Sequence, residues 1–260
     1  MLSWLLAMAI YNPWAQLHTS SQGMAEPIGS YSAGCLQGAR SLPLQSPYYQ
    51  ILRPSQGRYY GHSDLVQYIT ALTARAHQQQ LPPLLVGDMA MARGGPFLSG
   101  HKSHQIGLDV DFWFRFAKPR LSASQLEHPQ PLDMVSTNNR TVNKNFGWQQ
   151  AALLQFAASD SRVDRIFVHP AIKKALCSSS SPDREWLRKI RPWFGHRAHF
   201  HVRLGCPANA VDCKPQKPLP AGDGCGAELE SWFSGPTEVT QHAKPNPLPT
   251  LPARCEQLLD

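Results

Sequence analysis

Six widely spaced cysteines restrict the fold of this chain more than any other feature: Cys35, Cys177, Cys206, Cys213, Cys225 and Cys255. Zinc ribbons need closely paired thiolates at each end of the site, and no C-x-x-C pair is present. An even, scattered set is typical of disulfides formed in an oxidising compartment. The residues alone allow many pairings, and six buried free thiols in a cytosolic enzyme are the alternative.

The N-terminal residues favour export. Residues 2–10 are apolar, and Ala7-Met8-Ala9 matches the small-x-small pattern of a signal-peptidase site, although no Lys or Arg precedes it. We expect residues 1–9 to be a signal-peptide remnant and residues 10–260 to form a single domain. Eight of the 23 prolines lie between residues 214 and 255, which predicts a stiff C-terminal strap from about residue 214. Because no later apolar run approaches the roughly 18 residues that span a bilayer, we expect no integral membrane segment in the mature protein.

Charge narrows the class of partner. The formal net charge of +7 favours polyanions such as nucleic acid, anionic lipid or a carboxylate-rich wall polymer, with surface solubility as the alternative reading. The basic residues do not cluster with aromatic residues, which argues against nucleic acid. At 260 residues and 42% hydrophobic content, the chain can bury a core of useful size.

Apolar periodicity predicts separated helices and strands. Helices are expected from Ser63, as N-cap, to Pro82-Pro83, over residues 148–158, from Pro170 onward and over residues 183–190. Strands are expected over residues 84–86, 108–116, 165–169 and 199–204. This mixture, without an internal repeat, favours an α+β fold.

Three segments concentrate the residues that can carry chemistry: Gly100-His101-Lys102-Ser103-His104, Leu108-Asp109-Val110-Asp111-Phe112 and His196-Arg197-Ala198-His199-Phe200-His201. Side chains alternate between the two faces of a strand. His199 and His201 therefore share one face, about 6.6 Å apart along the strand. Asp109 and Asp111 likewise share a face. In each pair, one residue can bind a metal while the other acts on a group next to the metal.

A catalytic zinc would explain the polar face of these strands. Burying Asp111 unpaired between apolar neighbours is costly, and a metal removes that cost. His104 lies seven residues earlier, beyond the turn residue Gly107, so its loop can fold back. His104, Asp111 and His201 form a common zinc ligand set with a fourth position for water, whose pKa zinc lowers. His199 can then take the proton or stabilise the oxyanion, while Asp109 either orients a ligand or faces solvent.

The spacing His104-x6-Asp111 followed by His199-x-His201 resembles the LAS family of metallopeptidases, which act on D-amino-acid peptides and on peptidoglycan. From about residue 13 to residue 259, flanking segments are similar to its penicillin-insensitive murein endopeptidase branch. These segments are Ile28-Gly29-Ser30-Tyr31, Arg58-Tyr59-Tyr60-Gly61-His62, residues 100–111, Arg191-Pro192-Trp193-Phe194, residues 196–203 and residues 222–229.

The resemblance implies an LAS-type α+β fold, in which a central antiparallel sheet carries the zinc site between helices and long disulfide-tied loops. It implies the following assignments: zinc on His104, Asp111 and His201, His199 as catalytic histidine, His196 assisting catalysis or positioning substrate, and His101 as an accessory ligand. The implied disulfides are Cys35–Cys255, Cys177–Cys225 and Cys206–Cys213. Asn138, Asn139 and Thr141 stand where the family leads us to expect acidic or histidine side chains, so no accessory metal is expected in that loop.

The implied activity is zinc-dependent hydrolysis of the crosslink between D-alanine and meso-diaminopimelate of peptidoglycan in the periplasm. A G-x-S-x-G serine elbow is absent from the sequence, so insensitivity to β-lactams is expected. One alternative is a D-Ala-D-Ala carboxypeptidase or dipeptidase that uses the same ligands. Another is a non-catalytic wall-binding or metal-binding protein on the same scaffold. The preference for DD or LD crosslinks and the oligomeric state stay open.

Overall fold

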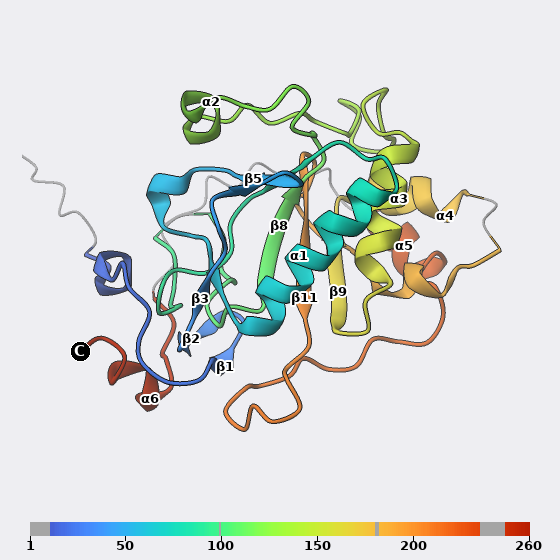
Figure 1. Ribbon diagram of the computed structural model, residues 1–260. Coiled ribbons are helices and arrows are strands. Elements are labelled where there is room, and N and C mark those ends of the chain that lie inside the picture. The colour runs from blue at the N-terminus through green and yellow to red at the C-terminus, as the bar shows by residue number, and fades with distance from the viewer. Residues whose placement is uncertain (1–10, 99, 180–181, 235–247) are drawn as a thin grey trace, which may run out of the picture.

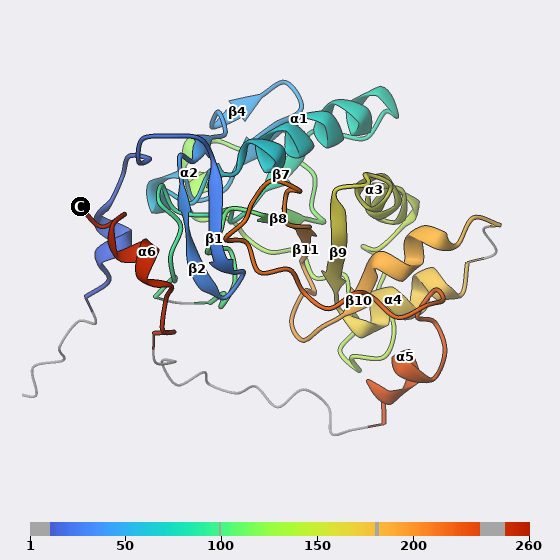
Figure 2. The same ribbon diagram turned by 90° about the horizontal axis from the view of Figure 1, so that it is seen from below.

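The four predicted strands lie side by side in the middle of a seven-stranded sheet with the order β10-β9-β11-β8-β7-β5-β4 (Figures 1 and 2). The structure, a computed structural model, describes residues 11–98, 100–179, 182–234 and 248–260. The predicted signal-peptide remnant therefore lies outside the described residues, as do residues 235–247 of the predicted strap. The strands are β1 (Glu26–Ser30), β2 (Ala33–Gln37), β3 (Arg40–Ser41), β4 (Gln45–Ser46), β5 (Tyr49–Ile51), β6 (Tyr60–Gly61), β7 (Leu84–Val86), β8 (Asp109–Trp113), β9 (Val163–Val168), β10 (Ile190–Pro192) and β11 (His199–Leu204).

The centre of the sheet is antiparallel, as predicted, and its flanks are mixed. β9, β11, β8 and β7 alternate in direction, whereas β10 runs parallel to β9 and β5 runs parallel to β7. Parallel neighbours need a long crossover connection, and helices supply both of them. α1 (Ser63–Gln78) lies between β5 and β7 in the chain, and α4 (Pro170–Cys177) lies between β9 and β10. The α+β prediction is confirmed.

Of the remaining helices only α3 is longer than five residues. They are α2 (Ala123–Glu127), α3 (Trp148–Ala158), α5 (Ala227–Ser231), α6 (Ala253–Glu256) and the 3-10 turns η1 (Pro13–Gln16), η2 (Pro54–Gln56) and η3 (Glu185–Lys189). Figure 2 shows α1 and α3 on one side of the sheet. On that side Val110, Phe112, Phe200 and Val202 are completely buried in the main core. The opposite face of the same strands carries the polar residues of the site.

Two helix predictions need correction. The N-cap of α1 is His62, not Ser63, because the His62 ring nitrogen Nδ1 accepts the N–H of Asp64 at 3.1 Å. Residues 183–190 do not form an α-helix: one 3-10 turn, η3, leads directly into β10. In the second case Ile190 pairs with Ile166 of β9, so the chain is already extended at the last residue of the predicted helix.

All three disulfides have the pairing implied by the resemblance: Cys35–Cys255, Cys177–Cys225 and Cys206–Cys213. The first ties α6 to β2, and the second ties the segment before α5 to the end of α4. α5 and α6 lie at opposite ends of the molecule in both views (Figures 1 and 2). Among the described residues, every helix is too short or too polar to cross a lipid bilayer.

Candidate metal centre

Asp111 and His201 face each other across the two central strands. β8 and β11 are antiparallel neighbours, and their register places His201 directly opposite Asp111. His201 Nδ1 lies 3.2 Å from Asp111 Oδ1, and both side chains are buried. The strand alternation expected from the sequence is confirmed at this point, with the polar face turned away from the apolar core.

His104 reaches the same point from the loop before β8. Gly107 turns this loop back with a φ of +69°, and a Cβ there would lie 2.3 Å from Leu36 Cδ2, so a side chain is excluded. His104 has a φ of +70°, a conformation supported by its backbone N–H, which donates to Asp109 Oδ2 at 3.0 Å. Its imidazole is completely buried, and Nε2 lies 3.6 Å from Asp111 Oδ1.

Asp109 orients the ring of His201. Its completely buried carboxylate lies 2.8 Å from His201 Nε2 and accepts a hydrogen bond from Arg203 Nε at 2.7 Å. A carboxylate at neutral pH only accepts, so Nε2 of His201 carries the hydrogen and Nδ1 presents its lone pair towards Asp111. Carboxylates hold ligand histidines of metal sites in this way. The contact favours the orienting role for Asp109 over exposure to solvent.

His101 joins the cluster from the partly exposed side. Its Nε2 lies 3.5 Å from Asp111 Oδ2 and 3.5 Å from Asp88 Oδ2. Asp88 is buried just beyond β7, where its backbone oxygen accepts the N–H of Asp111 at 3.0 Å. Arg58 pairs with the Asp88 carboxylate at 3.1 Å. Asp88 therefore holds both the backbone of Asp111 and the ring of His101.

His199 and His196 border the cluster. His199 Nε2 lies 3.9 Å from Asp111 Oδ2, and the ring centroids of His196 and His199 are 4.9 Å apart. His196 has a φ of +51°, and its Nδ1 lies 2.7 Å from the carbonyl oxygen of Phe194. Because a carbonyl only accepts, Nδ1 donates and Nε2 retains a lone pair.

Unpaired polar atoms show that these residues fit a cation. His104 Nδ1 and Nε2, Asp111 Oδ1 and His199 Nε2 are buried without a hydrogen-bond partner. An unsatisfied buried group costs about 1–3 kcal/mol, so a group that binds several of these atoms would remove a substantial penalty. Ligand atoms of His101, His104, Asp111 and His201 all lie within 4.8 Å of one another. Imidazole nitrogens with one carboxylate are the donor set of a catalytic zinc.

Burial and neighbouring charges shift the pKa values of most groups in the cluster towards the forms that bind metal, and shift that of His201 in the opposite direction. Burial lowers the pKa of His199, and lowers that of His104 well below its usual value, so both rings stay neutral. Burial would also lower the pKa of His201, but Asp109 and Asp111 raise it above its usual value. Burial would raise the pKa of Asp111, yet His101, His104 and His199 hold it well below its usual range, so the carboxylate is ionised.

The cluster opens into a cleft of about 650 Å³. The cleft is lined by cationic and aromatic side chains as well as by the histidines: Lys102, Arg165, Arg203, Phe167, Trp193 and Phe194. Such a cleft can hold an anionic, extended ligand against the polar strand face.

Comparison with known proteins identifies the family. The family model described as penicillin-insensitive murein endopeptidase matches residues 27–260. A relative of that name from Yersinia pestis bv. Antiqua (strain Antiqua) is 51% identical, over 95% of this chain and 90% of its own length. Relatives of the same name from Klebsiella pneumoniae subsp. pneumoniae and Salmonella arizonae are 49% and 47% identical, over 95% and 100% of this chain and 91% and 96% of their own. The chain belongs to the penicillin-insensitive murein endopeptidase family.

In this family member all the residues named from the sequence lie together: His101, His104, Asp111, His196, His199 and His201. Their roles as ligands and catalytic groups stay predictions. The loop containing Asn138, Asn139 and Thr141 adds no member to the ligand cluster of the described residues. Asn139 Oδ1 instead accepts a hydrogen bond from Arg197.

Three residues that support the cluster were not predicted from the sequence: Asp88, Arg58 and Phe167. Asp88 could have been found from its position, because it is a charged residue that follows the buried strand Leu84–Val86 and the turn residue Gly87. Arg58 lay within a segment already matched to the penicillin-insensitive murein endopeptidase family, but no partner for it was evident. Phe167, on β9 opposite His201, packs its ring 5.4 Å from that histidine.

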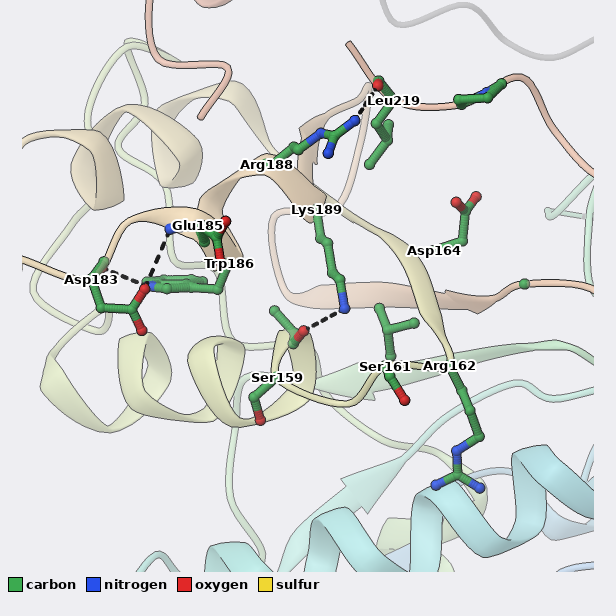
Figure 3. A pocket seen from close by; sticks show the side chains of 14 residues that line it. Ser159, Ser161, Arg162, Asp164, Asp183, Glu185, Trp186, Arg188, Lys189 and Leu219 are labelled. Atoms are coloured by element: carbon green, nitrogen blue, oxygen red, sulfur yellow. Dashed lines mark hydrogen bonds between the residues drawn. The ribbon is translucent and has the colours of Figure 1, made fainter. Parts of the chain in front are cut away.

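A second pocket, also of about 650 Å³, lies apart from the cluster, and none of its lining residues lines the cleft (Figure 3). Its cationic nitrogens are already bonded. Lys189 Nζ donates to the carbonyl oxygens of Ala158 and Asp160 at 2.9 and 2.8 Å. Arg162 pairs with the carboxylate of Asp160 at 2.7 Å. Arg188 donates to the carbonyl oxygen of Leu219.

Proposed function

We propose that this member of the family is a zinc-dependent endopeptidase that hydrolyses the D-alanyl–meso-diaminopimelyl crosslink of peptidoglycan, with DD and possible LD activity. The observation that carries the proposal is the set of buried, unpaired ligand atoms on His104 and Asp111 beside His201. The names of the relatives supply the reaction class, murein endopeptidase. The three disulfides and the net charge support a periplasmic protein that acts on an anionic wall polymer.

His104, Asp111 and His201 would hold the zinc, with His101 as an accessory ligand. When bound, zinc supplies Lewis acidity and lowers the pKa of a water ligand. Asp109 keeps the lone pair of His201 Nδ1 directed at the ligand position through its contact with Nε2. Asp88 supports the same geometry from behind, since its backbone oxygen holds the N–H of Asp111.

His199 would act as the catalytic histidine. Its Nε2 is unpaired beside Asp111, and burial keeps the ring neutral, so it can accept a proton from the attacking water. His196 lies next to it with Nδ1 bound to the Phe194 carbonyl oxygen, which leaves Nε2 to accept a hydrogen bond from the substrate. Lys102 in the cleft lining suits a carboxylate of a stem peptide. Arg165 and Arg203 line the cleft too and add positive charge to it, although each is already paired with an aspartate of the protein.

The test is digestion of purified crosslinked muropeptide dimers by the full chain, with product masses measured. We expect conversion of dimers to monomers, its loss with a chelator, and its return when zinc is restored. Cleavage that persists in chelator would overturn the zinc proposal. Loss of terminal alanine alone would favour the carboxypeptidase alternative, and binding to the wall without any turnover would favour the non-catalytic alternative.

A further inference from the structure

Three large aromatic side chains form a surface beside the cleft. Trp193 is 51% exposed and Phe194 is 60% exposed. Trp232, immediately after α5, packs against both, with ring centroids 6.1 Å from Trp193 and 4.9 Å from Phe194. We call Trp193, Phe194 and Trp232 the aromatic platform. Trp232 is half-buried beside these two exposed rings, and exposed large apolar side chains that lie together mark a contact site.

The chain holds the platform in place through several independent anchors. The disulfide Cys177–Cys225 ties the start of the α5 segment to the end of α4. Arg191, next to β9 on β10, pairs with Glu228 of α5. Leu229 of α5 is 1% exposed and anchors the helix in the protein. These three contacts hold the five-residue helix α5 in place, and Trp232 therefore lies next to the rim of the cleft.

Aromatic rings connect the platform with the metal centre. The ring of Phe167 lies 5.4 Å from that of His201 and 5.8 Å from that of Trp193. Trp193 and Phe194 also line the cleft itself. Three ring-to-ring steps of 5.4, 5.8 and 6.1 Å therefore lead from His201 to Trp232. The platform is continuous with the site at which the crosslink would be cleaved.

We infer that the aromatic platform binds a sugar ring of the glycan strand from which the crosslinked stem peptide branches; this inference rests on the proposed endopeptidase function. The apolar face of a pyranose ring suits exposed aromatic rings, whereas the stem carboxylates suit the cationic lining of the cleft. An extended stem of about four residues spans at most about 14 Å. A sugar at its end can therefore reach the platform at Trp193, two ring steps of 5.4 and 5.8 Å from His201, and contact Trp232 beside it while the crosslink lies at the metal centre.

The test compares two substrates: crosslinked dimers that carry their disaccharides, and the same dimers with the sugars removed. Trp232→Ala should raise KM for the sugar-bearing dimer about two- to tenfold relative to the sugar-free dimer, the range expected for the loss of one ring contact. Phe194→Ala should shift the same ratio in the same direction. Trp148→Ala is the matched control, because Trp148 is 68% exposed on α3 and does not line the cleft.

Direct binding supplies a second readout. The intrinsic tryptophan fluorescence of the full chain, titrated with an N-acetylglucosamine tetramer, should saturate, and Trp232→Ala should weaken the titration while circular dichroism stays unchanged. Equal KM changes for both substrates, or binding of the tetramer unaffected by Trp232→Ala, would overturn the sugar platform. If the wild-type chain cleaves neither dimer, the proposed endopeptidase function fails instead, and the two failures are thus distinguishable.

Discussion

The cleft and the second pocket have similar volumes and opposite chemistry. Each encloses about 650 Å³ and each is lined by charged and aromatic side chains. In the cluster at the base of the cleft, nitrogen and oxygen atoms of His104, Asp111 and His199 are buried without partners. In the second pocket, Arg188 and Lys189 already donate to oxygen atoms of the protein (Figure 3), and Arg162 donates to the carboxylate of Asp160.

This difference shows that volume and charge do not identify a functional site. A protein bonds nearly all of its buried polar groups, so several unpaired groups gathered around one point indicate a place where a ligand completes the structure. The second pocket is completed by its own backbone carbonyls. Variants of the cleft should therefore change metal content and turnover, whereas variants of the second pocket should change stability.

The largest expected effect is that of His104→Ala. It removes a completely buried proposed ligand, a histidine whose two ring nitrogens have no hydrogen-bond partner. We expect zinc content, measured by elemental analysis of purified protein, to fall from about one ion per chain to near zero. Muropeptide cleavage should fall below detection. His18→Ala, at an exposed histidine outside the cluster, should change neither quantity, and full zinc occupancy in His104→Ala would remove this residue from the ligand set.

His199→Ala should separate catalysis from metal binding. If His199 handles the proton, kcat/KM should fall about 10²- to 10⁴-fold, with zinc content unchanged because the proposed ligands remain. The measurement is steady-state cleavage of muropeptide dimers beside metal analysis of the same preparation. A loss of zinc that parallels the loss of activity would instead assign His199 to the metal, in keeping with its 3.9 Å distance from Asp111.

Asp109→Asn should weaken metal binding without abolishing it. The amide is uncharged and can no longer support the hydrogen bond from His201 Nε2 as the carboxylate does, and it also weakens the contact with Arg203. Loss of such an orienting partner costs about 10- to 100-fold in metal affinity. Competition with a zinc chelator measures this change. An affinity equal to that of the wild type would show that Asp109 serves only to pair Arg203.

Sequence predicted the polar face of the central strands because strand alternation is a local property. Two residues on the same face of β8 or β11 stay together whatever surrounds them, so Asp109 and Asp111 could be paired in advance. Asp88 and Trp232 could not, because their contacts join segments far apart in the chain. The parallel flanks of the sheet escaped prediction for the same reason: they depend on where the crossover helices return the chain.

The disulfide pairing shows in another way how far the sequence alone could predict the structure. Chain spacing left the partners of the six cysteines open, and the implied pairing came from the family resemblance. The helix predicted over residues 183–190 failed because a local apolar pattern could not register that Ile190 pairs with Ile166 on β9. Local periodicity thus predicted which side chains share a face, but not which strands become neighbours.

Lys173 is a buried lysine of α4 outside both the cleft and the second pocket, and its replacement should affect stability. Its Nζ donates to the carbonyl oxygens of Leu187 and Asp223 at 2.7 and 2.6 Å, and burial lowers its pKa to about 7. The folded state therefore binds fewer protons than the unfolded state between about pH 7 and the ordinary lysine pKa of 10.5. The free energy of unfolding should rise with pH across that window.

Urea denaturation of the wild type and of Lys173→Met at pH 7, 8 and 9 measures this dependence. The difference between the two proteins should grow in favour of the wild type as pH increases, by up to about 1.4 kcal/mol per pH unit. Lys174→Met, at the neighbouring exposed position of α4, is the control and should leave the slope unchanged. A pH-independent difference for Lys173→Met would show that the buried amine stays charged throughout.

Lys189→Met should have the smallest effect on turnover. It therefore tests the expectation that variants of the second pocket change stability rather than activity. Lys189 Nζ joins η3 to the end of α3 through the carbonyl oxygens of Ala158 and Asp160. Loss of these bonds should lower the free energy of unfolding by about 1 kcal/mol. Because this pocket has no part in the proposed chemistry, kcat/KM on muropeptide dimers should stay within about twofold of the wild type. A loss of activity larger than tenfold with the fold intact would show that the second pocket is part of the substrate site. The functional difference between the cleft and the second pocket would then be wrong.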